Sequence, residues 1–557
     1  MLALSTMVAQ EGGLIQQEIG FVLLLTVAAL VAILIRRIRL PYTVALVAVG
    51  LILALVPSFI VFDVSSDLIV AVLVPPLVFE ATLNMQWRDL RRDLPLVLLL
   101  AVGGTLLSTF IVGGIIFQLL DIPILGALAF GALIAATDPV AVIAFFKSLG
   151  VSKRLSILVE GESLFNDGVA IVVFNLTIAA ATAALATGGA VEFSLIDAIV
   201  EFLRVSTVGI GVGLLLGFVV AYVILRNIDD HLIETATTVA LAFGAYVAAE
   251  SLHASGLLAV VAAGLIVGNV GMHNTSPTTR LTLENFWEFL AFVANSLVFL
   301  LIGIEIQLAQ LWRFALPIIV AVVAVLVSRA ISVYTITALH NRLTPDQLEV
   351  PRRYQHVMFW GGLRGAVSLA LALTIGRNLF GTTIATEMQV MTFGVVLFTI
   401  LVQGATIERL IERLQLVQHR PQVIEGQRRQ AWVYARQAGR RELNRLHNEG
   451  FLDADTWQAM SAVYDEEIED TRRVIRDHLE AFPELERELY LNARADILKA
   501  ERSAVTDATT RGLISREVQE ELIGETDQRL AALDLLKSDS APGLSPSTIQ
   551  SLEHSDG

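Results

Sequence analysis

Two acidic segments in the apolar part of this chain have residue types that can bind a cation or a proton. The first is Ala135-Ala136-Thr137-Asp138-Pro139, in which Asp138 lies nine residues before Lys147. In a helix this separation is about 14 Å, so in a membrane span Asp138 would lie near the midplane. Pro139 donates no amide hydrogen and clashes with the preceding turn, so carbonyl groups near Ala135 should lose their helical partners. Free carbonyl oxygens beside a carboxylate would suit a dehydrated hard cation, although a proline kink with a hydrated Asp138 is the alternative.

The second segment is EGESLFNDG (160–168). Asp167 lies thirteen residues after Arg154, which is about 20 Å along a helix. It shares one helical face with Ser163. Glu162 and Asn166 share the neighbouring face. Low dielectric disfavours a lone charged carboxylate, so Asp167 should hold either a proton or a metal cation, and the two should compete. That competition is the minimal chemistry of an exchanger, and three acids in eight residues are less easily explained as polar contacts between helices.

Glu80 lies in a third apolar stretch, PPLVFEATLN (75–84), where two prolines loosen the helix. An ionisable side chain inside a bilayer is costly, so Glu80 is a functional candidate by default. It is also only about one and a half turns from Trp87 and Arg88, so snorkelling to the membrane surface is an equal explanation.

Two arginines are embedded in apolar sequence, Arg329 in VAVVAVLVSRAISVYTI (320–336) and Arg364 in WGGLRG (360–365). A buried arginine keeps its proton, so each should pair with a carboxylate. The candidate partners are Glu160, Glu162 and Glu305. The glycines around Arg364 indicate a second helix break, which an inverted repeat would make equivalent to the break at Pro139.

These residues lie in a chain of 557 residues that is 55% hydrophobic, with a mean hydropathy of +0.68. Stretches long enough to cross a hydrocarbon core recur between Gly20 and about Leu410. We therefore expect an all-α polytopic membrane protein with about 13 transmembrane helices. The expected spans are 17–35, 41–60, 66–86, 94–119, 123–146, 154–184, 195–225, 231–251, 254–271, 285–307, 312–339, 355–377 and 384–410.

Basic residues in the loops between these spans set the expected orientation. Alternate loops carry fourteen Lys and Arg residues on one side and two, Arg313 and Arg377, on the other. This asymmetry predicts an extracytoplasmic N-terminal segment (1–16) and a cytoplasmic C-terminus. We expect the chain to lie in the cell (inner) membrane.

The chain changes character after the last span. The part from Glu408 onward holds 20 of the 39 Lys and Arg residues and 29 of the 54 Asp and Glu residues. We expect a transmembrane domain at 17–410, a helical cytoplasmic domain at 411–537 and a disordered tail at 538–557. The expected helices of the cytoplasmic domain are 422–447, 454–481, 484–510 and 515–537. The net charge of −15 argues against nucleic acid as a partner.

Four segments together resemble the monovalent cation:proton antiporter family, which includes NhaP-type bacterial Na+/H+ antiporters and eukaryotic Na+/H+ exchangers. They are PPLVFEATLN (75–84), ATDPVAV (136–142), EGESLFNDGVA (160–170) and GGLRGAVSLA (361–370), and they occur in family order. The resemblance covers roughly residues 20–410 and does not extend to the tail, for which a regulatory role is analogy alone.

The resemblance implies a homodimer with inverted repeats, crossed broken helices in the fifth and twelfth spans, and elevator-like alternating access. It makes Asp167 the acid that binds the ion and the proton, with Asp138, Ser163, the backbone of Thr137 and Glu80 helping to coordinate Na+. No cofactor is implied beyond the transported Na+ and H+.

The resemblance also assigns supporting roles. Asn166 stands where electrogenic relatives carry a second aspartate, which implies electroneutral exchange. A Glu162–Arg329 pair would be a structural bridge, with Arg364 as the competing partner, and Pro139 marks the break beside the site.

The sequence favours exchange of Na+ for H+, with Li+ and K+ as alternative cations, over three other functions. A carboxylate-lined cation channel needs a continuous polar lining or a ring of charges, whereas these polar residues gather at one depth. Asp138 and Asp167 could form the dyad of an intramembrane aspartyl protease, but Pro139 and the surrounding oxygen atoms favour ion binding. Paired carboxylates would repel an organic anion. The sequence therefore predicts a secondary transporter and not an enzyme.

Overall fold

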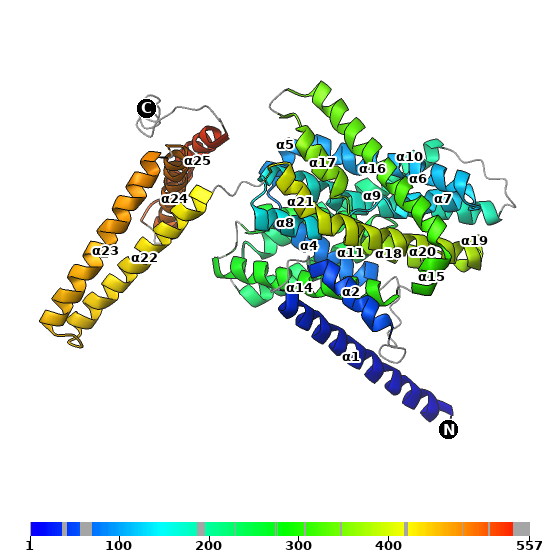
Figure 1. The fold of residues 1–557 in the computed structure, drawn as a ribbon, viewed down its shortest axis with the longest axis horizontal. Helices are drawn as coiled ribbons and strands as arrows, with labels where there is room; N and C mark the ends of the chain where they lie inside the picture. The colour runs from blue at the N-terminus through cyan, green and yellow to red at the C-terminus, as the bar shows by residue number, and fades with distance from the viewer. Residues whose placement is uncertain are drawn as a thin grey trace. The chain divides into compact units, whose positions relative to one another are not determined.

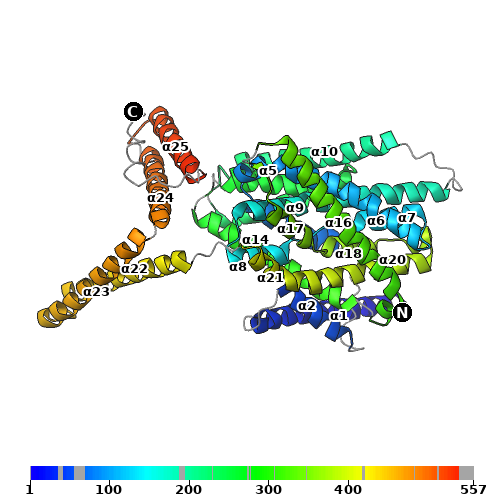
Figure 2. The same ribbon diagram turned by 45° about the horizontal axis from the view of Figure 1, so that its top comes forward.

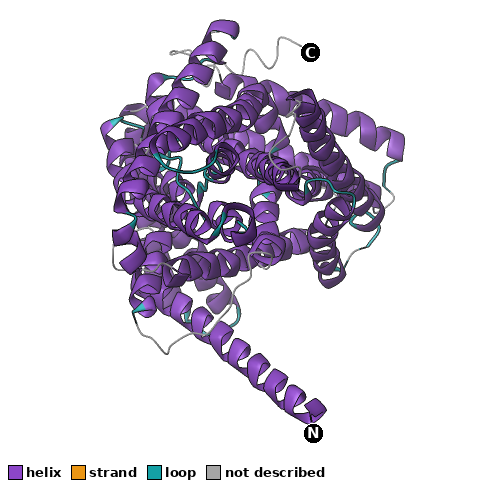
Figure 3. Cartoon of the chain, turned by 90° about the vertical axis from the view of Figure 1, so that its right-hand side faces the viewer, coloured by secondary structure: helices purple, strands orange, loops and turns teal. Residues whose placement is uncertain are grey.

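The structure is a computed structural model that describes residues 2–35, 42–55, 69–186, 195–228, 230–272, 275, 277–305, 308–345, 348–416, 421–481, 483–510 and 513–538. Among these residues, helices are the only regular secondary structure (Figure 3). The chain divides into two compact units, Met1–Gln418 and His419–Gly557. Apart from Ser538, the expected disordered tail lies outside the described residues.

The first unit is built from apolar helices joined by short connections (Figure 1). In chain order its α-helices are α1 (Leu2–Ile35), α2 (Tyr42–Ala54), α4 (Val74–Leu83), α5 (Trp87–Leu98), α6 (Thr105–Leu119), α7 (Ile124–Leu133), α8 (Val140–Leu149), α9 (Lys153–Ala186), α10 (Leu195–Val219), α11 (His231–Ser251), α12 (Gly256–Ile266), α14 (Pro277–Glu305), α15 (Leu308–Arg313), α16 (Ala315–Leu343), α17 (Arg352–Trp360), α18 (Ala366–Leu373), α19 (Arg377–Phe380), α20 (Thr382–Phe398) and α21 (Ala405–Arg413). Five π-helical turns extend or join them, at Ile69–Leu73, Leu99–Gly104, Val220–Ile224, Val267–Gly271 and Thr399–Gly404.

Seven helices in the described part of the chain are long and apolar enough to cross a membrane by themselves, and six shorter ones are apolar. Each expected span overlaps one of the helices or an interrupted helix pair. The expected N-terminal segment, 1–16, and the first span form one continuous helix, α1. At the other end α21 continues the last span to Arg413, and the first unit ends beyond the expected boundary at 410. The chain is a multi-pass membrane protein.

Two helices are interrupted, and the interruptions meet. Residues 134–139 separate α7 from α8, and residues 361–365 separate α17 from α18. Pro139 cannot continue the hydrogen-bonding pattern of α7, and the second break holds three glycines, which are poor helix formers. The amide of Asp138 donates to the carbonyl of Leu363 at 2.8 Å, so a backbone hydrogen bond joins the two breaks directly.

The helices around the breaks pack closely because small residues lie at their contacts. α14 packs against α2 and α4, and α10 packs against α12. A Cβ added at Gly50 would lie 2.8 Å from the Cα of Gly303, and Gly213 allows the same close approach to Ala259. Phe79 of α4 packs against the fully buried Trp287 of α14, with ring centroids 4.4 Å apart and the ring planes tilted by 38°. These contacts hold α2, α4 and α14 together beside the interrupted helices.

The second unit consists of two helix pairs, α22 (Pro421–Asn448) with α23 (Ala454–Ala481) and α24 (Pro483–Thr510) with α25 (Arg516–Ser538) (Figures 1 and 2). These helices begin and end within a residue or two of the expected ranges. Arg440 of α22 pairs with Asp465 of α23 at 3.0 Å. Asp453 caps α23, and hydrogen bonds from Thr456 hold the pKa of its carboxyl below the usual value.

Candidate ion-binding site

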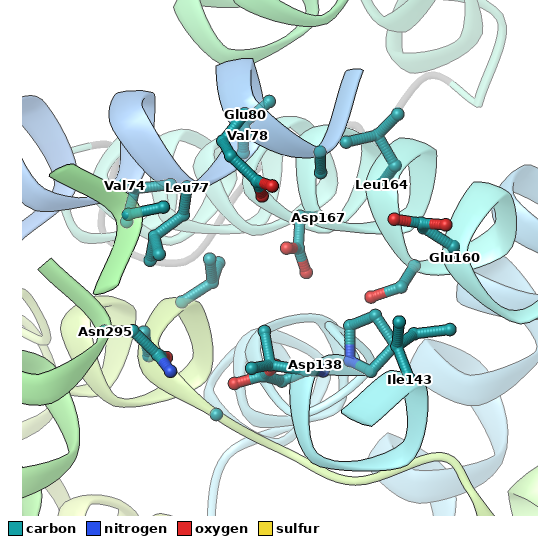
Figure 4. Close-up of a pocket in the computed structure, with 18 of the residues that line it drawn as sticks. Val74, Leu77, Val78, Glu80, Asp138, Ile143, Glu160, Leu164, Asp167 and Asn295 are labelled. Carbon is teal, nitrogen blue, oxygen red and sulfur yellow. The ribbon is translucent and has the colours of Figure 1, made fainter. Parts of the chain in front are cut away.

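A cavity of about 340 Å³ lies between α4, α8, α9, α14 and α18 (Figure 4). It extends from the ends of α4 and α8, where Asn84 and Lys147 lie, to the two helix breaks. The charged residues that line it are Glu80, Asp138, Lys147, Glu160, Asp167 and Glu288. Every residue that the sequence analysis proposed as an ion ligand therefore faces one cavity: Asp167, Asp138, Ser163, Thr137 and Glu80.

Asp138 and Asp167 form the deep end of this cavity, from two different helices. Asp138 lies in the break before α8, and its Oδ1 accepts a hydrogen bond of 3.0 Å from the amide of Val140, the first residue of that helix. The partial positive charge of a helix N-terminus stabilises a carboxylate there. Asp167 projects from the middle of α9 toward the same space (Figure 4), where it interacts with the backbone amide of Thr137. Two carboxylates thus face one cavity.

Neutral oxygen atoms lie beside these carboxylates. The hydroxyl of Ser163 donates to the carbonyl of Thr137, which leaves lone pairs on both oxygens. Asn166 positions the break from its other side: its Nδ2 donates to the Ala135 carbonyl at 2.9 Å and to the Thr137 hydroxyl at 3.2 Å. Its Oδ1 accepts a 2.6 Å hydrogen bond from Thr105. Asn166 is therefore a structural side chain, because its hydrogen bonds hold the non-helical segment that carries Asp138 in place.

Arg364 does not pair with a carboxylate, contrary to the expectation from sequence. It is 2% exposed, and its Nη1 donates to the carbonyls of Ala135 and Ala136 at 2.6 and 3.1 Å. These carbonyls lie in the break just after α7, whose C-terminal end is the negative end of the helix dipole, so the guanidinium supplies a compensating positive charge there. The expectation that these carbonyls would be free to bind a cation was consequently wrong. The oxygens that remain for a cation belong to Thr137, Ser163 and the two aspartates.

Glu162 pairs with Arg329, which is one of the two arginines that the sequence analysis offered as its partner. Arg329 contacts both carboxylate oxygens, through Nη1 and, at 3.0 Å, through Nη2, and the two side chains are 2% and 10% exposed. Nη2 also donates to the carbonyl of Met358 at 2.9 Å, near the end of α17. Each interrupted helix therefore has an arginine bound to carbonyls at or beside its break. Of the other two candidate partners, Glu160 lines the cavity and forms no ion pair with an arginine that the structure describes, and the side chain of Glu305 lies outside the described residues.

The shallow part of the cavity carries most of its charge. Glu80 lines the cavity, where its Oε1 accepts a 2.8 Å hydrogen bond from Asn84, one helical turn nearer the end of α4. Glu160 acts electrostatically on Glu80, and Lys147 acts on both carboxylates. A cation that enters would pass this acidic region, which should raise the local cation concentration, before it reaches Asp167.

Sequence reasoning missed the wall that α14 contributes. Glu288 and Asn295 of α14 line the cavity, as does Ser368 of α18. Glu288 and Asn295 are seven residues apart, which places them on one helical face, and this spacing is the signal that could have found them. No group of three or more His, Asp or Glu side chains in the described part of the chain is arranged to hold a metal ion.

The fold and the site together define a class of protein, a multi-pass membrane transporter whose acidic cavity ends between two interrupted helices. The chain belongs to the sodium/hydrogen exchanger family: the family described as "Sodium/hydrogen exchanger, transmembrane" matches residues 22–413. This membership confirms the resemblance that the four sequence motifs indicated, and it confirms a transporter and not an enzyme.

Individual relatives agree with this assignment. The chain is 43% identical over 387 residues to the Na(+)/H(+) antiporter ApNhaP of Aphanothece halophytica, a match that covers 69% of this chain and 71% of that protein. It is 34% identical over 516 residues to the Na(+)/H(+) antiporter NhaG of Bacillus atrophaeus, which covers 90% and 95% of the two chains. Among solved structures, the sodium proton antiporter MjNhaP1 of Methanocaldococcus jannaschii shares the fold, with a TM-score of 0.59 at 22% identity over 72% of this chain and 99% of that one.

Proposed function

We propose that this protein exchanges Na+ for H+ across the plasma membrane, with Asp167 as the group that binds either ion. The observation that carries the proposal is the pair of carboxylates, Asp138 and Asp167, at the deep end of one cavity beside the oxygens of Ser163 and Thr137. The names of the relatives ApNhaP and NhaG, both Na+/H+ antiporters, support the same assignment.

Exchange follows from competition for one carboxylate. Asp138 and Arg364 are the charged groups that act most directly on Asp167. Arg364 is permanently charged and bound to carbonyls of the first break, and Asp138 caps the N-terminus of α8, which stabilises its charged form. Asp167 projects from the middle of α9, away from any helix end, so it is the acid better able to exchange a proton for Na+. Carboxylate, hydroxyl and carbonyl oxygens are ligands suited to a hard cation. Bound Na+ would displace the proton, and a proton would displace Na+.

Alternating access requires the site to change sides, and the contacts described above suit an elevator-like movement. The two breaks are joined by the Asp138–Leu363 backbone bond and by Arg364, so they should move as one body. α4 and α14 form the opposite wall of the cavity, and α14 also packs against α2, so these three helices are the natural stationary part. The cavity reaches Lys147, on the side where the basic loops lie, so it would open to the cytoplasm.

This proposal includes the topology that the sequence predicts. The chain would cross the membrane thirteen times, with its N-terminus outside and the helical domain of residues 411–537 in the cytoplasm, and it would form a homodimer. Li+ and K+ remain alternative cations. The site residues assigned to Na+ are those that line the cavity, Asp167, Asp138, Ser163 and Thr137, with Glu80 closer to its mouth.

One proton should move for each Na+. Asn166 is neutral, and its amide is engaged by Thr105, Ala135 and Thr137. It therefore supplies no second proton, and exchange should be electroneutral. A membrane potential of 100 mV biases an electrogenic cycle by about 2.3 kcal/mol per net charge moved, so the two cases are well separated.

Purified protein in vesicles with an internal pH dye tests the proposal. A Na+ gradient should drive a pH change, and Asp167→Asn, which keeps nearly the same shape, should abolish it without loss of folded protein. Asp121→Asn, at an exposed acid outside the cavity, is the matched control and should transport normally. Persisting Na+-driven pH change in Asp167→Asn would refute the role of Asp167.

The stoichiometry needs a second measurement on the same vesicles. Potentials are set with K+ and valinomycin, and the Na+ and pH gradients at which net flux stops are determined. An electroneutral exchanger has a null point that does not move with voltage. A shift with voltage would mean that more than one proton moves per Na+, and Asp138 would then be the leading second carrier.

A further inference from the structure

The wall that α14 adds to the cavity is polar at both ends and apolar between. Glu288, Ala291, Phe292 and Asn295 line the cavity and follow the spacing of a single helical face. Glu288 is the member nearer the mouth, and Asn295 lies two turns deeper, about 10 Å along the helix. α14 thus brings one neutral polar group close to the depth at which the aspartates lie.

Asn295 is buried, and its side chain has no hydrogen-bond partner among the residues that the structure describes. Asn295 is 8% exposed, and its side chain points into the cavity (Figure 4). The adjacent Ser296, in contrast, bonds the hydroxyl of Tyr42 at 2.8 Å. A buried amide has two donor hydrogens and an acceptor oxygen, and burying them unpaired costs free energy. The partner of Asn295 should therefore be something that enters the cavity.

An amide oxygen has a specific value at a site where Na+ and H+ compete. Like a carbonyl or a carboxylate, it is a good ligand for a hard cation. Unlike a carboxylate, it takes up no proton in the physiological range, because the amide is not a titratable side chain. Asn295 can consequently favour the cation over the proton, which none of the cavity carboxylates can do.

We propose that Asn295 is a cation ligand of the cavity, contributed by the wall opposite the helix breaks, and that its amide oxygen raises the affinity for Na+ without adding a proton-binding group. This inference rests on the proposed function, because it concerns the cation that competes for Asp167. It assigns to α14 a part in ion selectivity beyond its packing role. The other deep ligands, Asp138, Thr137 and Ser163, come from the break and from α9.

The test compares Asn295→Ala with Asn295→Asp in the full-length protein reconstituted in vesicles. The initial rate of Na+-driven pH change is measured against Na+ concentration at several pH values. Asn295→Ala removes one oxygen ligand, whose contribution to binding should be similar to that of a hydrogen bond. The half-saturating Na+ concentration should therefore rise about tenfold. Asn295→Asp keeps an oxygen at the same position, so at alkaline pH it should keep a half-saturating concentration near that of the unmodified protein; at acidic pH the added carboxylate takes up a proton, so the value should rise more steeply than in the unmodified protein. Ser296→Ala, which alters the neighbouring residue outside the cavity, should not change it.

A binding measurement separates affinity from transport and from folding. The melting temperature of each purified variant is determined with and without NaCl at constant ionic strength. Asn295→Ala should melt at nearly the same temperature as the unmodified protein without Na+, and should need more Na+ for the same stabilisation.

Two results would overturn the inference. One is an unchanged half-saturating concentration in Asn295→Ala; the other is an equal increase in the Ala and Asp variants, which would show a purely structural role. Failure of the proposed function looks different, because the unmodified protein would then show no Na+-driven pH change at all.

Discussion

Removing either partner of the buried Glu162–Arg329 pair should destabilise the protein, and the two losses should be unequal. The pair joins α9 to α16, and both side chains are almost fully enclosed, at 2% and 10% exposure. In Glu162→Gln the guanidinium keeps its charge, and the Met358 carbonyl becomes its remaining charge-compensating partner. In Arg329→Met the carboxylate of Glu162 can instead take up a proton and become neutral. Glu162→Gln should therefore be the more harmful change.

The magnitude follows from the burial. Breaking a buried ion pair by removing one partner costs about 3–5 kcal/mol, because an uncompensated charge stays in low dielectric. We expect Glu162→Gln near the top of that range and Arg329→Met below it. The double variant Glu162→Gln/Arg329→Met carries no buried charge at this position, so it should recover part of the loss.

Denaturant unfolding of the purified protein in detergent measures these differences as a double-mutant cycle. The exposed pair Arg280–Glu284, one helical turn apart at the start of α14, is the control, with side chains 59% and 38% exposed. Its cycle should give a coupling of about 0–1 kcal/mol. Additive losses in the Glu162–Arg329 cycle would refute the reasoning, since they would mean that the two charges do not depend on each other.

Two further changes test the charges around the site. Lys147→Gln removes the basic side chain from the described cavity lining, so the half-saturating Na+ concentration should fall about threefold at low ionic strength, and the difference should fade at high salt. Lys147→Arg should behave like the unmodified protein, and a salt-independent effect would argue against an electrostatic cause. Asp93→Asn weakens the contact of the buried Asp93 with Arg154, whose guanidinium also holds the carbonyls of Leu348 and Glu349. Amide hydrogen exchange at residues 348–350 should then accelerate, and unchanged exchange would mean that Asp93 does not fix this loop.

The positions of the helices and of the acidic ligands could be predicted from the sequence because their signals are local. Proline and glycine mark the two breaks, and apolar runs with basic ends mark the spans. Asp138, Asp167 and Ser163 stand out because ionisable or hydroxyl groups are rare in such runs, and the structure places all three at one cavity. A four-residue spacing was enough to put Ser163 and Asp167 on the same face of α9.

The partners of the buried arginines could not be predicted in the same way. The rule that a buried arginine pairs with a carboxylate holds for Arg329, but Arg364 binds carbonyls in the break after α7 instead. Carbonyl groups at or beside a helix end can compensate the charge of an arginine only when the chain folds so that the two meet. The sequence around Arg364 does not indicate which segment will lie beside it. Asn295 was missed for a related reason: a single amide in an apolar helix looks the same whether it faces a cavity or a neighbouring helix.

Because the amide of Asp138 donates to the carbonyl of Leu363, the backbone and the side chain at position 138 have separate roles. The carboxylate at position 138 lines the cavity and has the proposed role in ion binding, whereas the amide at the same position joins the two helix breaks whatever side chain is present. In a deep mutational scan, substitutions at 138 should therefore divide into many that lose transport but reach the membrane and one, proline, that also fails to fold. Position 365 should tolerate glycine alone, because a Cβ there would overlap the Asp138 carboxylate. Substitutions can therefore change the side chains that line the cavity more freely than they can change the backbone contact between the two helix breaks.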